Sequence, residues 1–405
     1  MERPLYHNRD FMLLWSGQIV ASLGSGVTRI VYPLLILALT NSPAQAGLCS
    51  ALTMLPYLFF SLPAGALVDR WNRKRVMIIC DIARALVLAC IPLTMLFDAL
   101  AVWQLYLATF VEGTFFVFFS LAEVAALPRV VDKMQIAAAL AQNEAGFTTT
   151  HILSPSVGTW LYNTSQIFPF AFNAVSYLAS AVSLCFLRIQ LKSEPQEKRP
   201  LWKDVHEGLS WLWNHGLLRY MAFLTGGLSF VGGSSQLLVI VLAKKFGASE
   251  AEIGLLFSVS ATGGIAGALI ASRVPQYFRF SHIIILTSTL LTLLFPLYGF
   301  APSLFWLTAI NLIMQIVGPV YNIAQYSNRV QLIPDKLQGR VNAAYRMIAM
   351  GAFPLGSATV GVLIENFGTS VAILCFFFWQ VCFALSAILS QQLKQSSLAP
   401  QPSTK

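Results

Sequence analysis

Five ionisable side chains interrupt long apolar stretches of this chain, and they are its strongest candidates for chemistry. They are Arg29, Glu112, Glu144, His151 and Arg346. An ionisable group in apolar surroundings is costly, so it usually has a partner and a function. A dry environment disfavours the charged form of a carboxylate, so Glu112 is the best candidate to exchange a proton, with Glu144 as a second. His151 is a candidate proton relay, although a lone helical histidine is more often a hydrogen-bonded packing residue.

Polar side chains also form three stripes, because residues spaced three or four apart share one face of a helix. The stripes are Gln18, Ser22, Ser25 and Arg29; Glu144, Thr148, His151 and Pro155; and Asn311, Gln315, Asn322, Gln325 and Arg329. Such faces should turn away from lipid, toward a wet cavity or another helix. The side chains expected to line a substrate cavity are Gln18, Ser22, Arg29, Asn311, Gln315, Asn322 and Arg346. For the uncharged members, hydrogen bonding between helices without a transport role is an equal alternative.

The elements that position these residues are apolar helices. The 405 residues are 56% hydrophobic and 11% charged, whereas soluble domains carry about 25% charged residues. Twelve segments are each long enough to cross about 30 Å of hydrocarbon as a helix. Their approximate limits are 11–39, 44–68, 76–97, 101–126, 137–162, 166–188, 219–243, 252–273, 282–300, 303–328, 338–364 and 368–391. We predict an all-α integral membrane protein, because long apolar runs favour helices over a barrel.

The distribution of positive charge orients these segments. The chain has 26 Lys and Arg residues, and most fall in loops on one side of this map, whereas the opposite loops hold only Lys244 and Lys245. Short loops rich in Lys and Arg stay in the cytoplasm, so both termini should be cytoplasmic. The net charge of +9 therefore reflects topology in a lipid bilayer, and we expect no nucleic-acid partner.

Metal, cofactor and enzyme chemistry are not indicated by the sequence. The six cysteines lie in or beside apolar runs without metal-ligand spacing. A nucleotide-binding motif is absent, and the apolar segments carry no cluster of a nucleophile with a base. We therefore expect neither metal nor cofactor.

The chain divides into two similar halves. We expect a bundle of six helices at 1–189, a cytoplasmic linker with an interfacial helix at 190–218, a second six-helix bundle at 219–393 and a tail at 394–405. The motif AGALVDR at 64–70 corresponds to AGALIAS at 266–272, which indicates duplication and a pseudo-twofold axis. Glu144 and Arg346 are equivalent across the halves. We expect them to pair when the cytoplasmic side is closed.

The loop GALVDRWNRKR at 65–75 resembles the loop between helices 2 and 3 of the major facilitator superfamily. The matching residues are Gly65, Asp69, Arg70, Arg73 and Lys74. Asn72 replaces the family's loop glycine, as a residue that tolerates a left-handed backbone. The alternative is that the cluster only anchors topology.

Further stretches, among them NRDFMLLWSGQIVASLGS and IPDKLQGRVNAAYRMIAMGAFPLG, resemble the macrolide-efflux and enterobactin-exporter branch of this superfamily. The resemblance implies an exporter in a bacterial inner membrane. It also implies that Asp69 latches against the start of the eleventh span at Arg340, with Arg73 and Glu123 completing a charge network.

Two motifs depart from the superfamily's patterns. The segment SPSVGT resembles its exporters' fifth-helix motif, with Pro155 and Gly158 matching and Ser154 and Thr159 replacing glycines. The segment TFVEG lacks the fourth-helix arginine and has Glu112 nearby instead.

The resulting hypothesis is a monomeric secondary transporter that exports amphipathic organic compounds by alternating access in exchange for protons. The alternatives are a nutrient uptake symporter and a membrane receptor or assembly partner that carries no flux.

Overall fold

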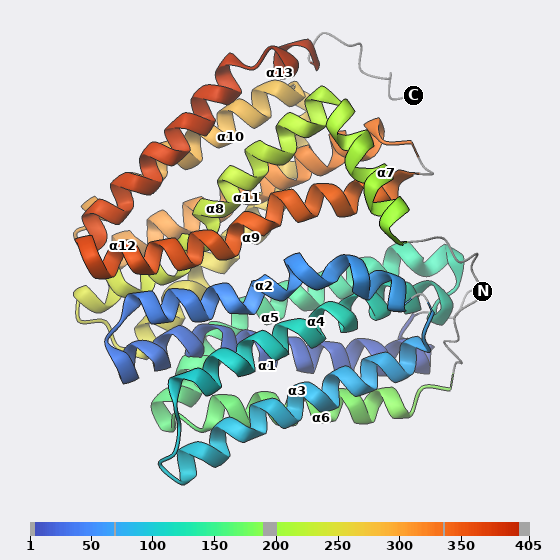
Figure 1. The fold of residues 1–405 in the computed structure, drawn as a ribbon, viewed down its shortest axis with the longest axis vertical. Coiled ribbons are helices and arrows are strands. Elements are labelled where there is room, and N and C mark those ends of the chain that lie inside the picture. The colour runs from blue at the N-terminus through green and yellow to red at the C-terminus, as the bar shows by residue number, and fades with distance from the viewer. Residues whose placement is uncertain (1–4, 69, 189–200, 335–336, 397–405) are drawn as a thin grey trace. The chain divides into compact units, whose positions relative to one another are not determined.

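The computed structural model describes residues 5–68, 70–188, 201–334 and 337–396, and within these ranges every regular element is a helix (Figure 1). Asp69, the expected latch residue, lies outside the described residues, as do residues 190–200 of the expected linker and most of the tail. The described chain separates into two compact units.

The first unit comprises Met1–Leu201 together with Ser249–Ser258, the beginning of a later helix. Its six long helices are α1 (Arg9–Thr40), α2 (Pro43–Val68), α3 (Arg73–Leu96), α4 (Val102–Val130), α5 (Ile136–Thr164) and α6 (Phe168–Cys185). Helix α1 lies at the centre of their packing, because it contacts α2, α4, α5 and α6. Helix α3 packs against α4 and α6, so α1, α3, α4 and α6 surround a common interior.

The second unit comprises Trp202–Ala248 and Val259–Lys405. Its elements are α7 (Leu201–Asn214), α8 (Gly216–Lys245), the rest of α9 (Glu250–Tyr277), α10 (Phe280–Leu294), the 3-10 helix η3 (Phe295–Phe300), α11 (Leu304–Leu332), α12 (Gln338–Leu389) and α13 (Gln391–Ser396). Helix α12 is two helices joined at a kink, where Gly368 has a φ of 82°. Glycine adopts this left-handed backbone at no steric cost.

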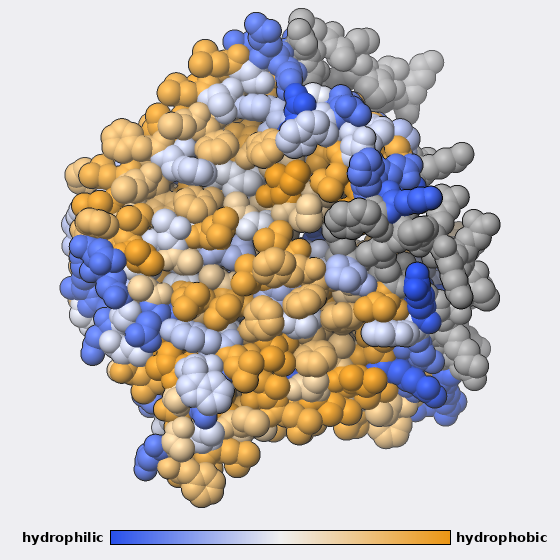
Figure 2. All heavy atoms as spheres, viewed as in Figure 1, coloured by the Kyte–Doolittle hydropathy of each residue, from blue (hydrophilic) through white to orange (hydrophobic). Residues whose placement is uncertain are grey.

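Nine of the described helices are long and apolar enough to cross a membrane. Separating α12 at its kink and adding α2 and α5, of 26 and 29 residues, gives twelve rods in the described chain. Large apolar side chains such as Leu86, Trp160 and Phe305 are 63%, 65% and 75% exposed, and apolar residues cover much of the face seen in Figure 2. Lipid is the solvent that such surfaces require. The predicted all-α membrane fold is confirmed.

The loop after α2 contains the N-cap of α3, which the sequence analysis did not predict. Asn72 has an extended backbone, with φ −69° and ψ 109°, and its side chain accepts a hydrogen bond from the Arg75 N–H. Asn72 therefore does not adopt the left-handed backbone that its residue type tolerates, because it is the N-cap of α3. The start of α3 is tied to its neighbours by Lys74, whose Nζ donates to the carbonyls of Cys185 and Leu187 at 2.9 and 2.7 Å.

Glycine allows a close helix contact in the second unit. A Cβ on Gly356 of α12 would overlap the Phe230 carbonyl oxygen of α8, whereas one on Gly318 of α11 would meet no atom within 4 Å. Both glycines lie inside helices, so a substitution at Gly318 is a matched control for the same substitution at Gly356.

We predict that Gly356→Ala lowers the free energy of unfolding by about 1–3 kcal/mol, because α8 and α12 must move apart. Gly318→Ala should be neutral or stabilising by up to about 1 kcal/mol, because alanine favours helix. Thermal unfolding of both variants in detergent tests this, and equal melting temperatures would contradict the packing described.

Candidate functional site

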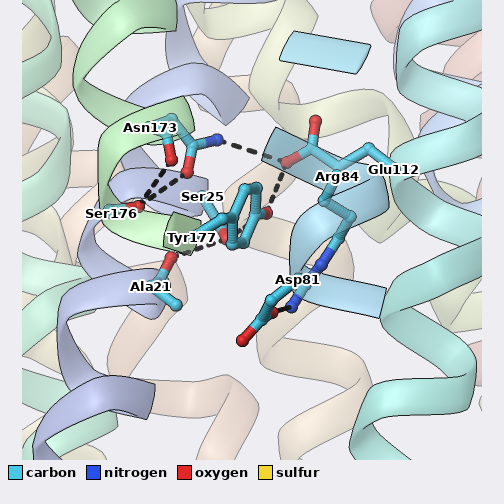
Figure 3. A network of polar contacts seen from close by, with 8 residues as sticks. All are labelled: Ala21, Ser25, Asp81, Arg84, Glu112, Asn173, Ser176 and Tyr177. Atoms are coloured by element: carbon cyan, nitrogen blue, oxygen red, sulfur yellow. Dashed lines mark hydrogen bonds and ion pairs between the residues drawn. The ribbon is translucent and has the colours of Figure 1, made fainter. Parts of the chain in front are cut away.

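A buried polar network occupies the interior shared by α1, α3, α4 and α6 (Figure 3). Helical spacing positions its members, since Asp81 and Arg84 are one turn apart on α3, and Asn173 and Tyr177 are one turn apart on α6. Glu112 projects into the same interior from α4. The network therefore joins residues that are distant in the sequence.

Glu112 is the hydrogen-bonded centre of the network and is only 8% exposed. Its Oε1 lies 2.7 Å from the Tyr177 hydroxyl and 3.3 Å from Asn173 Nδ2, and its Oε2 lies 3.3 Å from the Tyr32 hydroxyl. Burial of a carboxyl group requires such partners, because removal from water is otherwise costly. Arg29 of α1 also interacts electrostatically with Glu112.

An ion pair lies beside this carboxyl group. The Arg84 guanidinium pairs with the Asp81 carboxylate, and both side chains are almost completely buried. The same guanidinium lies over two aromatic rings, with its carbon 4.1 Å from the centroid of Tyr177 and 4.9 Å from that of Phe119. Arg84 therefore links the ion pair to the ring whose hydroxyl contacts Glu112.

Hydroxyl and amide groups connect the network to α1. The Tyr177 and Ser25 hydroxyls are 2.7 Å apart, and the Ser25 hydroxyl donates to the Ala21 carbonyl at 2.8 Å. Asn173 Nδ2 donates to Thr28 Oγ1 at 2.9 Å. These contacts attach Glu112 to the helix that carries the first predicted polar stripe.

The other predicted residues of the first bundle lie partly outside this network. Glu144, His151 and Arg29 are exposed in a structure that contains no lipid, whereas Gln18 is 5% exposed. The Ser22 hydroxyl contacts Thr150 at 3.1 Å, which is the interhelical bonding considered above as an alternative.

Most of the predicted gating residues lie at or near the ends of α2, α3 and α4. Gly65 has open space around it, and Arg70 is exposed. Arg73 donates to the Ala125 carbonyl of α4 at 2.7 Å. Glu123 is half-buried, beside Gln18 and within electrostatic range of Asp81 and Arg84.

The predicted motif of α5 lies in a close helix contact. A Cβ on Gly158 would lie 2.9 Å from the Val27 carbonyl oxygen of α1. One helical turn earlier, the carbonyl oxygen of Pro155 would lie 2.7 Å from a Cβ on Gly254, in the part of α9 that belongs to the first unit. Small residues therefore allow α5 to approach two helices closely.

In the second unit, the predicted stripe of α11 is divided between two environments. Asn311 is buried and accepts a hydrogen bond from the Tyr298 hydroxyl at 2.9 Å, whereas Gln315 and Asn322 are exposed. Arg346 of α12 is also exposed. Because Glu144 and Arg346 belong to different units, their pairing stays a prediction.

Arg340, predicted to take part in gating, connects α12 to the amphipathic helix α7. Its guanidinium pairs with the Glu207 carboxylate, and a Cβ on Gly208 would lie 2.5 Å from the Arg340 carbonyl oxygen. A cavity of about 510 Å³ lies beside this contact and is lined by His206, Trp211 and Leu337, among others. Helix α7 therefore packs onto the start of α12.

Sequence reasoning missed five members of the network as site residues, namely Tyr32, Asp81, Arg84, Asn173 and Tyr177. Opposite charges three residues apart in an apolar run were an available signal for the ion pair. Asn173 and Tyr177 share one helix face, but nothing in the sequence indicated that this face meets Glu112.

A family model described as "Transmembrane secretion effector" matches residues 3–403, which is almost the whole chain. The chain belongs to this family of the major facilitator superfamily. It is 27% identical to "Multidrug efflux pump Tap" of Mycobacterium tuberculosis, over 96% of this chain and 95% of that protein. It is 22% identical to "Macrolide efflux protein A" of Streptococcus pyogenes, over 98% and 100% of the two chains.

Several solved structures have the same fold as this chain. A bacterial homologue of the human lysosomal transporter Spinster superposes with a TM-score of 0.78 at 14% identity, covering 100% of both chains. The nucleoside transporter NupG superposes with a TM-score of 0.78 at 13% identity, covering 94% of this chain and 98% of that one. At these identities the likeness concerns the fold alone. The expected superfamily membership is confirmed, and relatives named as pumps support a transporter rather than an enzyme.

We predict that Asp81→Asn destabilises the protein by about 3–5 kcal/mol, because Arg84 is left buried without a countercharge. The double variant Asp81→Leu with Arg84→Met should regain most of this loss, because it removes both charges. Thermal unfolding in detergent compares the two. A double variant less stable than Asp81→Asn would contradict this account of the ion pair.

Proposed function

We propose that this chain exports amphipathic organic compounds across the cytoplasmic membrane in exchange for entering protons, with Glu112 as the proton-binding residue. The single observation that carries the proposal is the placement of Glu112, a carboxyl group inside a membrane-spanning bundle with three hydrogen-bond partners. Ionisable residues at such positions mark ion and proton pathways.

The substrate class comes from the relatives. Proteins named multidrug and macrolide efflux pumps align with almost the whole chain, so the transport machinery as a whole is comparable. Release of an organic cation on protonation of a carboxyl group, and its binding on deprotonation, would join the two fluxes. Glu144 and His151 remain proposed accessory proton groups, and the exposed Arg29, Gln315, Asn322 and Arg346 remain proposed cavity residues.

We predict that Glu112→Gln abolishes dye transport driven by a pH gradient in proteoliposomes, with ethidium as the probe. Ethidium counterflow without a gradient should weaken as well, because glutamine resembles the protonated carboxyl group that releases the cation. Asp98→Asn, the same chemical change in the exposed loop between α3 and α4, should behave as wild type.

Gradient-driven transport by Glu112→Gln at the wild-type rate would contradict the role of Glu112. Dye accumulation in the direction of proton movement would indicate a symporter. If the wild-type protein binds the dye but does not transport it, the result would favour a receptor.

The proposed orientation places both termini in the cytoplasm, because the loops with most Lys and Arg share that side. We predict that, in a background without the six native cysteines, Arg75→Cys is labelled only from the cytoplasm and Phe246→Cys, at a side chain that is 43% exposed, only from outside. A membrane-impermeant maleimide applied to whole cells and to inverted vesicles measures this. The reverse labelling pattern would overturn the orientation.

A further inference from the structure

A chain of three short oxygen–oxygen contacts links Glu112 to the backbone of α1 (Figure 3). Glu112 Oε1 lies 2.7 Å from the Tyr177 hydroxyl, which lies 2.7 Å from the Ser25 hydroxyl. The Ser25 hydroxyl lies 2.8 Å from the Ala21 carbonyl oxygen. At these distances each contact is a hydrogen bond only if one hydrogen lies between the two oxygens.

The number of hydrogens determines the protonation state that satisfies the whole chain. The Ala21 carbonyl only accepts, and Tyr177 and Ser25 supply one hydroxyl hydrogen each. Three contacts therefore need a third hydrogen, and the Glu112 carboxyl group is the one member able to carry it. The hydrogen bonds then all run in one direction, from Glu112 through Tyr177 and Ser25 to Ala21.

Loss of that proton forces one contact to break. An ionised Glu112 accepts from Tyr177, and this charge-assisted bond is stronger than a neutral one. The single Ser25 hydrogen must then serve either Tyr177 or the Ala21 carbonyl. If it stays on Ala21, the Tyr177 and Ser25 oxygens face each other without a hydrogen between them.

We propose that Tyr177 and Ser25 are positioning residues that transmit the protonation state of Glu112 to α1. This inference rests on the proposed role of Glu112 as the proton-binding residue. A serine hydroxyl that bonds the carbonyl four residues earlier bends its helix. When Glu112 loses its proton, Ser25 turns from Ala21 to Tyr177 and the bend of α1 changes.

The packing around Ser25 makes such a bend consequential. On either side of it, a Cβ on Gly24 would overlap Ser176 of α6, and one on Gly26 would overlap Ser154 of α5. Helix α1 therefore packs closely against α5 and α6 on both sides of Ser25, where the hydrogen-bond chain reaches it. A change in bend displaces α1, with its polar stripe, against both neighbours.

The hydrogen-bond chain joins Glu112 to α1 at Ser25, whereas Tyr32 and the Asn173–Thr28 contact join it to α1 at other positions. The titratable and charged groups that face Glu112 are Arg29 and Tyr32 from α1, Cys49 from α2, Arg84 from α3 and Tyr177 from α6. Arg84, paired with Asp81, lies on the Tyr177 ring and holds its orientation. Tyr32 donates to the other carboxyl oxygen, which accepts in both protonation states of Glu112.

Infrared titration of the full-length protein in nanodiscs tests the proposal without transport. The carboxylic acid band that Glu112→Gln removes reports the protonation of Glu112. Ser25→Ala should move its titration midpoint to lower pH by about 0.5–1 unit, because only the protonated form needs Ser25 as acceptor. Tyr177→Phe should move it to higher pH, because the ionised form loses its closest donor.

Two matched variants separate this effect from a general loss of packing. Ser25→Thr keeps the hydroxyl group and should titrate as wild type. Ser16→Ala removes an exposed hydroxyl of the same helix, one that lies 3.5 Å from the Leu13 carbonyl oxygen, and should also titrate as wild type. A midpoint in Ser25→Ala equal to that of wild type would overturn the proposal.

A conformational measurement gives the second arm. Spin labels at Leu39 of α1 and Val175 of α6, both exposed, should change their separation with pH in the wild type and in Ser16→Ala. In Ser25→Ala the separation of the spin labels should not change with pH. A pH-dependent separation in this variant would overturn the proposal that Ser25 transmits the protonation state of Glu112 to α1. Failure of Glu112→Gln to affect gradient-driven transport would instead refute the proposed function, so the two failures are distinguishable.

Discussion

The constraint on which the first bundle depends is the cost of a carboxyl group in an apolar interior. Glu112 is tolerated because α1 and α6 supply Tyr32, Asn173 and Tyr177 as partners. Helices α1, α3 and α6 each present polar side chains to the interior that contains Glu112 rather than to lipid. A second carboxylate, Asp81, is neutralised directly by Arg84. The two solutions differ, because an ion pair fixes a charge whereas hydrogen bonds from hydroxyl groups can adapt to either protonation state.

Packing by small residues is the second requirement of this architecture. Apolar contact between helices has little driving force in lipid, so close approach and hydrogen bonding must hold the bundle. Gly24, Gly26 and Gly158 bring α1 against α5 and α6, and Gly356 brings α12 against α8. A bundle joined through such contacts responds to small changes of helix shape, because a shift of one backbone displaces the next. This property suits a transporter whose helices must change their arrangement during the cycle.

The sequence was sufficient for the helices, because hydrophobic length and charge asymmetry are local properties. The kink at Gly368 falls at the limit expected between the last two segments. Glu112 was identified because a carboxylate in an apolar run is rare. The sequence did not assign a conformation to Asn72, because its residue type fits both a left-handed turn and an N-cap, and the choice depends on where α3 begins. The α11 stripe was treated as one face, yet Asn311 packs against Tyr298 while Gln315 is exposed.

The sequence by itself thus determined that this chain spans a membrane as apolar helices and that Glu112 needs a partner, and it predicts which way the basic loops point. Only the tertiary structure decided which partners those are, because Tyr32, Asn173 and Tyr177 are separated from Glu112 by 61 to 80 residues. The direction of the hydrogen-bond chain from Glu112 to Ala21 also could not be derived without the tertiary structure. Hydroxyl groups donate or accept according to their neighbours, and those neighbours come from helices that the sequence does not place side by side.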